Sequence, residues 1–218
     1  KAEETALEAR PYAKKALELL KNVLRFSLHE GAAHAFFKKS LYKNICLVVV
    51  TSDKGLCGAF NAAVLRKTAQ FIESHKDATI HVVAVGKKAK DFFERRHIPV
   101  IKTFTRFSEI TSVYDALPVI SYVLEQFDSE TYDSVYVSST IFASALSQYP
   151  RVTHLLPLSI EGLEEIVKNI VPKSERYKAM FQNEEGENKP HPYLFEPSLN
   201  LVLDELVRDL VRVGLLHL

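Results

Sequence analysis

Residues 45–51, Ile-Cys-Leu-Val-Val-Val-Thr, contain no charged side chain and constrain the fold more than any other segment. An apolar run of this length, without alternating polar positions, is typical of a strand that is buried on both faces. Burial on both faces requires a layer of helices on each side of a sheet. Residues 79–85 repeat the pattern with a single histidine. We therefore expect two inner strands of a layered α/β domain.

Helical and strand patterns alternate after the first buried run. The helix patterns cover residues 61–74, 87–96 and 112–127, the last interrupted by Pro118. The further strand patterns cover residues 99–104, 133–138 and 152–158. Such alternation favours a mainly parallel sheet, and it leaves an antiparallel edge position open to the final strand. We place this α/β domain at residues 40–160.

Amphipathic helices are predicted at the two ends of the chain, at residues 1–30 and 197–218. In both, apolar residues recur at spacings of three and four, the period of a coiled-coil seam. One helix runs into the domain and the other runs out of it, so a pair formed by them would be antiparallel. The residues expected to meet in that pair are Ala13, Ala16, Leu17 and Leu20 with Leu203, Leu206, Leu210 and Val213. The alternative is that each helix packs separately on the domain.

The two ends of the chain and the segment before the last helix carry further signals. The chain begins at Lys1 within a helical pattern that has no N-cap residue, and its apolar last residues have no stop signal. We interpret it as a fragment cut through two helices. Residues 160–192 are mostly polar and are predicted to form a long loop insertion.

Composition excludes several classes of function. The formal net charge of +1 gives no global attraction to nucleic acid or to anionic lipid. No apolar run reaches the roughly 18 residues that a transmembrane helix needs, and no signal peptide pattern opens the chain. Cys46 and Cys57 are too few for a disulfide framework and suggest a reducing compartment.

The segment 51–61, Thr-Ser-Asp-Lys-Gly-Leu-Cys-Gly-Ala-Phe-Asn, joins a buried strand to a helix, where α/β proteins often bind ligands. A phosphate site is one interpretation, because backbone N–H groups at a helix start bind anions. The phosphate-loop and dinucleotide patterns are both absent, however. We favour a structural turn in which Gly55 or Gly58 has a positive φ or lacks room for a Cβ atom. Cys57 is expected to fill the turn, partly buried, and the alternative is a reactive thiol.

The remaining chemistry-bearing residues form no recognisable site. The eight histidines lack the spacing of a zinc motif, and the serines lack the nucleophile motif of hydrolases. Residues 87–106 hold seven basic and two acidic side chains. A solvated helix face is the favoured interpretation of this segment, and a surface for nucleic acid or acidic lipid headgroups is the alternative. We expect no catalytic residue, no metal and no cofactor.

The chain resembles the gamma subunit of the F-type rotary ATP synthase. The resemblance depends first on residues 52–61, which match the SD-[RK]-GLCG-x-x-N segment of that family. Residues 8–12, 155–158 and 193–198 match further landmarks in the right order. The motif residues are Ser52, Asp53, Lys54, Gly55, Leu56, Cys57, Gly58 and Asn61.

The resemblance implies a Rossmann-like domain at the foot of a central stalk, with the terminal helices forming the base of an antiparallel coiled coil. In the family, this subunit has no catalytic residues and transmits torque between the membrane rotor ring of c subunits and the ring of alpha and beta subunits. The epsilon subunit is a further implied partner. The implied location is peripheral, on the cytoplasmic face of the bacterial membrane or on the matrix side in mitochondria.

The chain also departs from the family pattern. The family's first and last motifs are absent, so this fragment should not drive rotation by itself. The insertion at 160–192 contains no cysteine, so the dithiol switch of the chloroplast form is not available. The rival hypothesis is a small nucleotide- or phosphate-binding enzyme that uses the Asp53–Asn61 turn, and saturable nucleotide binding would favour it.

Overall fold

A computed structural model describes residues 43–106, 113–144 and 147–157, together with Glu205, Arg208, Asp209 and Arg212. The chain divides into two compact units. One unit is residues 35–158 with Leu218, and the other is residues 1–34 with 159–217. The α/β domain belongs to the first unit. The predicted helix-pairing residues and the 160–192 insertion lie outside the described residues, so the predicted domain boundaries stay predictions.

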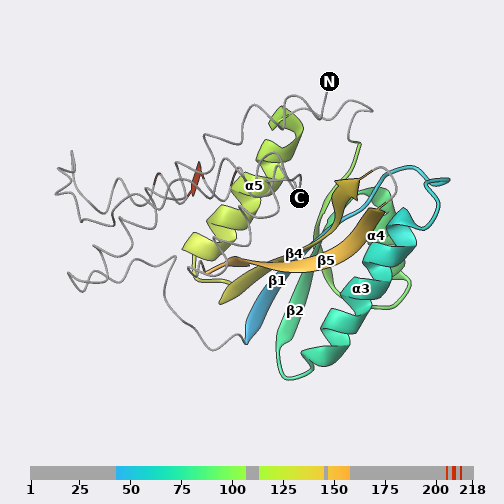
Figure 1. The fold of residues 1–218 in the computed structure, drawn as a ribbon. Helices are drawn as coiled ribbons and strands as arrows, with labels where there is room; N and C mark the ends of the chain where they lie inside the picture. The colour runs from blue at the N-terminus through green and yellow to red at the C-terminus, as the bar shows by residue number, and fades with distance from the viewer. Residues whose placement is uncertain are drawn as a thin grey trace, which may run out of the picture. The chain divides into compact units, whose positions relative to one another are not determined.

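The first unit is built on a five-stranded sheet with the order β3-β2-β1-β4-β5 (Figure 1). The strands are β1 (Asn44–Val50), β2 (Thr79–Val85), β3 (Val100–Phe104), β4 (Ser134–Ser144) and β5 (Ser147–Leu156). The first four are parallel, and β5 pairs with β4 in the antiparallel direction at the edge. This arrangement confirms the predicted α/β class, and the last strand takes the antiparallel edge position that the sequence left open.

Helices cover both faces of the sheet, as the apolar run of β1 predicts. Figure 1 shows α3 (Phe60–Ser74) and α4 (Lys87–Glu94) on one face and α5 (Val113–Asp128) on the other. Leu47 and Val49 of β1 belong to a buried cluster with Val64 of α3 and Phe93 of α4. Side chains of β1 point alternately to the two faces, so the strand links two apolar cores.

The structure differs from the sequence prediction at two prolines. Helix α5 runs through Pro118 instead of being interrupted there. Pro118 is the sixth residue of α5 and costs the helix the one backbone hydrogen bond that its missing N–H would donate. Strand β5 begins earlier than the predicted residue 152 and includes Pro150. An edge strand tolerates a proline because one side of its ladder has no neighbour to bond.

Strand β4 is also longer than the predicted segment 133–138. Its pairing with β1 ends at Ser138, and beyond that point it pairs with β5 alone. The extension is therefore a two-stranded ribbon. Its sequence includes the polar residues Ser139 and Thr140, so an apolar run does not predict that the strand continues.

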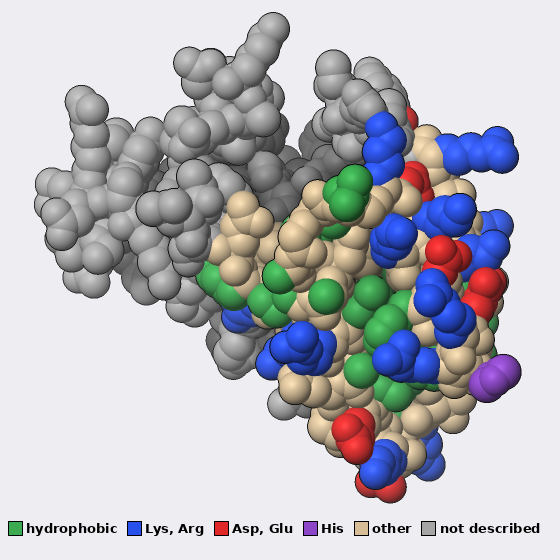
Figure 2. Space-filling model, turned by 90° about the vertical axis from the view of Figure 1, so that its right-hand side faces the viewer, with side chains coloured by type: hydrophobic (Ala, Val, Ile, Leu, Met, Phe, Trp, Pro, Cys, Tyr) green, Lys and Arg blue, Asp and Glu red, His purple; other side chains and the backbone are tan. Residues whose placement is uncertain are grey.

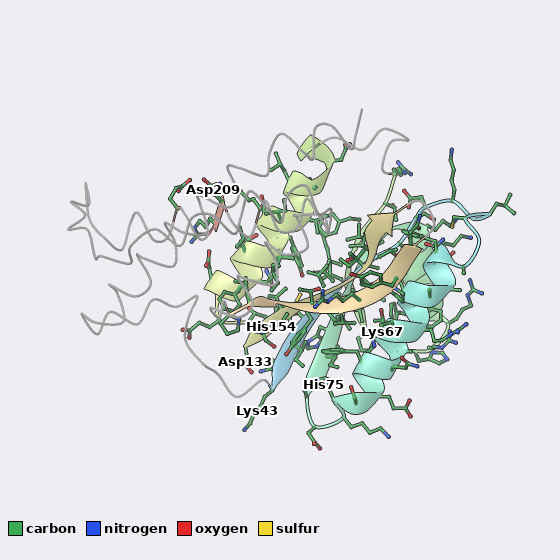
Figure 3. All side chains as sticks on the ribbon, in the orientation of Figure 1. Lys43, Lys67, His75, Asp133, His154 and Asp209 are labelled. Atoms are coloured by element: carbon green, nitrogen blue, oxygen red, sulfur yellow. The ribbon has the colours of Figure 1, made fainter. Side chains whose placement is uncertain are left out.

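Asp133 lies directly before β4 and holds the start of β1 beside the start of β4 (Figure 3). One of its carboxylate oxygens, Oδ2, accepts hydrogen bonds from the backbone N–H groups of Lys43 (3.0 Å) and Asn44 (2.8 Å). The backbone N–H of Asp133 in turn donates to the carbonyl of Asn44 at 2.9 Å. These bonds set the relative register of β1 and β4.

Aromatic side chains connect α3 to β4 and β5. The ring centroids of Phe71 and His75 lie 4.1 Å apart, those of Phe71 and Tyr136 lie 4.8 Å apart, and those of Tyr136 and His154 lie 4.7 Å apart. Burial lowers the pKa of His154, and a hydrogen bond with the backbone of Leu156 opposes that shift. His154 therefore favours its neutral form within this stack.

Candidate functional site

The turn between β1 and α3 is braced by the carboxylate of Asp53. Its Oδ1 accepts a hydrogen bond from the backbone N–H of Lys87 (2.8 Å), and its Oδ2 accepts one from the backbone N–H of Arg106 (2.7 Å). Lys87 is the first residue of α4, and Arg106 follows the end of β3. A carboxylate at a helix start is favoured by the helix dipole. Asp53 thus ties three consecutive strand-to-helix connections together.

Asn61 holds the inner part of the same turn. Its Oδ1 accepts a hydrogen bond from the backbone N–H of Ser52 (3.0 Å), and its Nδ2 donates to Ser52 Oγ (2.8 Å) and to Cys57 Sγ (2.9 Å). Asn61 is buried, so these partners offset the cost of removing its amide from water. A side chain without both a donor and an acceptor could not satisfy this set of contacts.

A second strand-to-helix turn, at Gly86, packs directly against the end of β1. Gly86 has a φ of 92°, and a Cβ atom built on it would lie 2.7 Å from the carbonyl carbon of Thr51 and closer still to its oxygen. Thr51 N–H and Oγ1 both donate to Val85 O, at 2.8 and 3.1 Å. Thr51 Oγ1 also accepts from Ala89 N–H at 2.9 Å. The close approach that we expected at Gly55 or Gly58 therefore occurs at Gly86.

The predicted glycines themselves have other surroundings. Gly58 has a positive φ of 57°, as expected for one of the two, but no atom lies within 4 Å of a Cβ built on it. A Cβ on Gly55 would touch only the side chain of Lys88, at 3.5 Å from Nζ. The turn is therefore conformationally demanding at Gly58, and it is not tightly packed there.

The tip of the turn projects into solvent. Leu56 is fully exposed and has a φ of 64°, which is uncommon for a leucine. Cys57 is exposed as well. The prediction that Cys57 is a partly buried filler is wrong, because the buried amide of Asn61 occupies that position and contacts Cys57 Sγ from the inner side. Cys46 is buried as predicted, and burial raises the pKa of its thiol to about 12.

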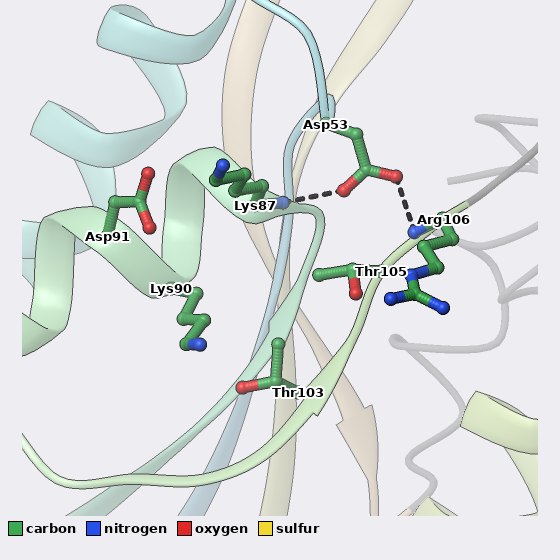
Figure 4. A pocket seen from close by; sticks show the side chains of 7 residues that line it. All are labelled: Asp53, Lys87, Lys90, Asp91, Thr103, Thr105 and Arg106. Atoms are coloured by element: carbon green, nitrogen blue, oxygen red, sulfur yellow. Dashed lines mark hydrogen bonds between the residues drawn. The ribbon is translucent and has the colours of Figure 1, made fainter.

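A hollow of about 450 Å³ lies beside the turn. In Figure 4, Asp53 spans from α4 to Arg106, and the side chains of Lys90, Thr103, Thr105 and Arg106 border the space below. The other lining residues are Lys87 and Asp91. Figure 2 shows that lysine and arginine side chains gather around hydrophobic ones on the face formed by α3 and α4.

The geometry gives the Asp53 turn little scope for catalysis. Both carboxylate oxygens of Asp53 and the amide of Asn61 accept or donate hydrogen bonds within the chain. The described ranges contain no group of three or more His, Cys, Asp or Glu side chains that could hold a metal ion. The strand order reverses between β1 and β4, where doubly wound sheets bind nucleotides, whereas the hollow lies on the other side of β1.

Comparisons with known proteins decide the family. A family model described as ATP synthase matches residues 1–218. The ATP synthase gamma chain of Pelotomaculum thermopropionicum is 32% identical over 221 residues, which cover 100% of this chain and 69% of that protein. The chain belongs to the ATP synthase gamma-chain family.

A second gamma chain and a solved structure show the same similarity. The gamma chain of Gloeothece citriformis is 31% identical over 215 residues, covering 95% of this chain and 68% of its own length. The central stalk of the Tetrahymena thermophila mitochondrial ATP synthase, solved with its c ring, superimposes with a TM-score of 0.54. That match covers 99% of this chain and 89% of the other at 19% identity, so it supports the fold alone.

The structure adds residues to the turn that the sequence motif does not include. Of the motif residues, Asn61 is buried, Ser52 and Asp53 are half-buried, and Lys54–Gly58 are exposed. Gly86, Thr51 and the backbone of Arg106 complete the brace but lie outside the motif. Gly86 could have been predicted from its position between a buried strand and a helix. It lies between β2 and α4, as the motif lies between β1 and α3.

The described part of the last predicted helix is limited to four charged residues. Glu205, Arg208, Asp209 and Arg212 are helical. Arg212 Nη1 lies 2.7 Å from Asp209 Oδ1 and 3.8 Å from Glu205 Oε1. These charges fall outside the predicted apolar seam, and as exposed pairs they contribute little to stability.

Proposed function

We propose that this chain is the globular foot of the central stalk of a rotary ATP synthase and transmits torque without catalysing a reaction itself. The observation that carries the proposal is the match to the gamma-chain family over the whole chain. A torque-bearing foot must keep its shape under load. The sheet with two helical layers, together with the Asp53 brace, supplies that rigidity.

The site geometry supports a non-catalytic role. Asp53 and Asn61, the polar residues that a ligand site would need, bond to the backbone and side chains of the turn. The motif then serves as a rigid support for an exposed tip at Leu56 and Cys57. ATP chemistry belongs, in this proposal, to the alpha and beta subunits.

The proposed partners are the membrane ring of c subunits, the alpha and beta subunits, and the epsilon subunit. The gamma chains that it resembles carry the name of an ATP synthase, and the Tetrahymena structure contains a central stalk together with a c ring. Among the described residues, no helix is both long and apolar enough to cross a membrane. We propose a peripheral position at the coupling membrane.

The terminal helices are proposed to form the base of the rotating shaft. Substitution Leu206→Asp places a charge in the predicted seam, so it should separate the helices and leave the α/β domain folded. Burial of a leucine in such a seam stabilises by roughly 1.5–3 kcal/mol. The matched control is Glu205→Gln, which changes an exposed residue on the same helix.

Two assays test the proposal with a full-length gamma subunit that contains this chain. Co-purification with epsilon reports docking, and ATP-driven proton pumping in reconstituted membranes reports torque transmission. We expect Leu206→Asp to keep epsilon and to lose pumping, and Glu205→Gln to keep both. Loss of epsilon with intact pumping would contradict this division of labour.

A further inference from the structure

The hollow beside the Asp53 brace has a chemistry that torque transmission does not use. Its lining contains three cationic side chains, two threonine hydroxyls and two carboxylates, contributed by α4, by the end of β3 and by the turn after β1. In Figure 4, Lys90 and Arg106 lie on opposite sides of the same space, with Thr103 and Thr105 between them. These groups come from segments that the sheet and the brace hold at fixed positions.

Cations outnumber carboxylates at the hollow by three to two, and one of the two carboxylates, Asp53, already accepts hydrogen bonds. Both oxygens of Asp53 accept backbone N–H groups, including one at the start of α4. Lys90 Nζ lies 3.8 Å from Glu94 Oε1, a long and exposed ion pair that costs little to exchange. The surrounding segment 87–106 has seven basic and two acidic side chains, a surplus of five positive charges.

We propose that this hollow binds a phosphate-type oxyanion. A phosphate group is a compact polyanion with several acceptor oxygens, and it needs donors that converge from different directions. Arg106 offers a planar fork of N–H groups, Lys90 offers an ammonium, and Thr103 and Thr105 offer hydroxyls. The volume of about 450 Å³ falls within the usual range of small-molecule sites and leaves room for a group attached to the phosphate.

The geometry favours a phosphate over the two nearest alternatives. A bound dinucleotide would lie at the reversal of strand order between β1 and β4, which is not where the hollow lies. An acidic protein segment would need an extended row of cations, whereas these donors surround one concavity. The inference does not depend on the role in the central stalk, so each can fail without the other.

The experiment titrates the 218-residue chain with inorganic phosphate and with pyrophosphate at constant ionic strength, followed by amide NMR shifts. We expect saturable shifts confined to Lys87–Asp91 and Thr103–Arg106, with no response to chloride. The double variant Lys90→Gln/Arg106→Gln removes two charge-assisted contacts and should weaken binding by at least about tenfold. The matched control is Arg66→Gln/Lys67→Gln, which removes two exposed charges from α3 and should bind as the parent does.

Further experiments distinguish a lipid headgroup from a soluble phosphate compound, and some of their outcomes would overturn the proposal. Retention on phosphatidylcholine vesicles containing phosphatidic acid, lost in Lys90→Gln/Arg106→Gln, would assign the phosphate to a lipid headgroup. Phosphate binding without such retention would assign it to a soluble molecule. Non-saturable shifts, or equal weakening in the two double variants, would overturn the proposal. The proposal would also be overturned if the chain bound neither phosphate nor pyrophosphate but did bind a hexaglutamate peptide, and if Lys90→Gln/Arg106→Gln abolished that peptide binding. Thermal melting by circular dichroism checks that each variant is folded.

Discussion

Replacing Gly86 by alanine introduces a Cβ atom for which the carboxyl end of β1 leaves no space. The new atom would lie 2.7 Å from the carbonyl carbon and 2.9 Å from Oγ1 of Thr51. A non-glycine residue at a φ of 92° and a ψ of 146° costs about 1–3 kcal/mol in backbone strain. Moving Thr51 away would also weaken its bonds to Val85 and Ala89, at about 0.5–1.5 kcal/mol each.

Together these terms predict that Gly86→Ala lowers the free energy of unfolding by about 2–6 kcal/mol, a large part of the roughly 5–15 kcal/mol of a typical domain. Urea unfolding followed by circular dichroism measures this loss. The other two glycines provide a graded control. Gly58→Ala has a positive φ but open space, so it should cost about 1 kcal/mol, and Gly55→Ala should stay within about 0.5 kcal/mol.

The opposite order would refute the reasoning. If Gly86→Ala unfolds at the same urea concentration as the parent, the close approach to Thr51 does not constrain the fold. If Gly58→Ala is the most damaging variant, the motif turn is more tightly packed than the structure indicates.

Three further predictions concern the turn and the two cores. A thiol reagent should label Cys57 rapidly in the folded chain and Cys46 only on unfolding, since Cys46 is buried with its pKa raised to about 12; rapid labelling that survives Cys57→Ser would contradict this. Asp53→Ala should speed hydrogen exchange at the amides of Lys87 and Arg106, because both lose their acceptor, and should cost about 1–3 kcal/mol; unchanged exchange at both amides would show that Asp53 is not a brace. His154 has a pKa below its usual value of about 6.5 in the folded chain, so the unfolded chain binds the proton more readily. The contribution of His154 to the free energy of unfolding should be fully present above about pH 6.5 and should fall as the pH drops below it. His154→Phe should flatten the dependence of the free energy of unfolding on pH in this range. An unchanged dependence between about pH 6.5 and 5 would exclude His154 as its source.

The sheet could be predicted from the sequence because its inner strands are continuous apolar runs. β1 and β2 are buried on both faces, which leaves little room for polar residues. The β4–β5 ribbon could not be bounded in this way. Beyond Ser138 the ribbon has only two strands, and its polar positions and Pro150 carry no burial signal.

The candidate site was predictable as a place but not as a set of contacts. The motif locates Asp53 and Asn61 at the turn, but it does not show that Asp53 reaches Arg106, which is 53 residues away in sequence. Such a bond depends on the order of the strands, which a local pattern does not specify. The same limit explains why Gly86 was missed: its constraint comes from Thr51 of the neighbouring strand.

The ratio of protons pumped to ATP hydrolysed tests the central claim most directly. It should be measured in one reconstituted sample of the complete enzyme, with the parent gamma subunit and with Leu206→Asp. A torque-transmitting, non-catalytic foot predicts that Leu206→Asp lowers this ratio severalfold while hydrolysis by the alpha and beta subunits continues. An unchanged ratio despite separated helices, or hydrolysis by the purified gamma subunit alone, would contradict the account.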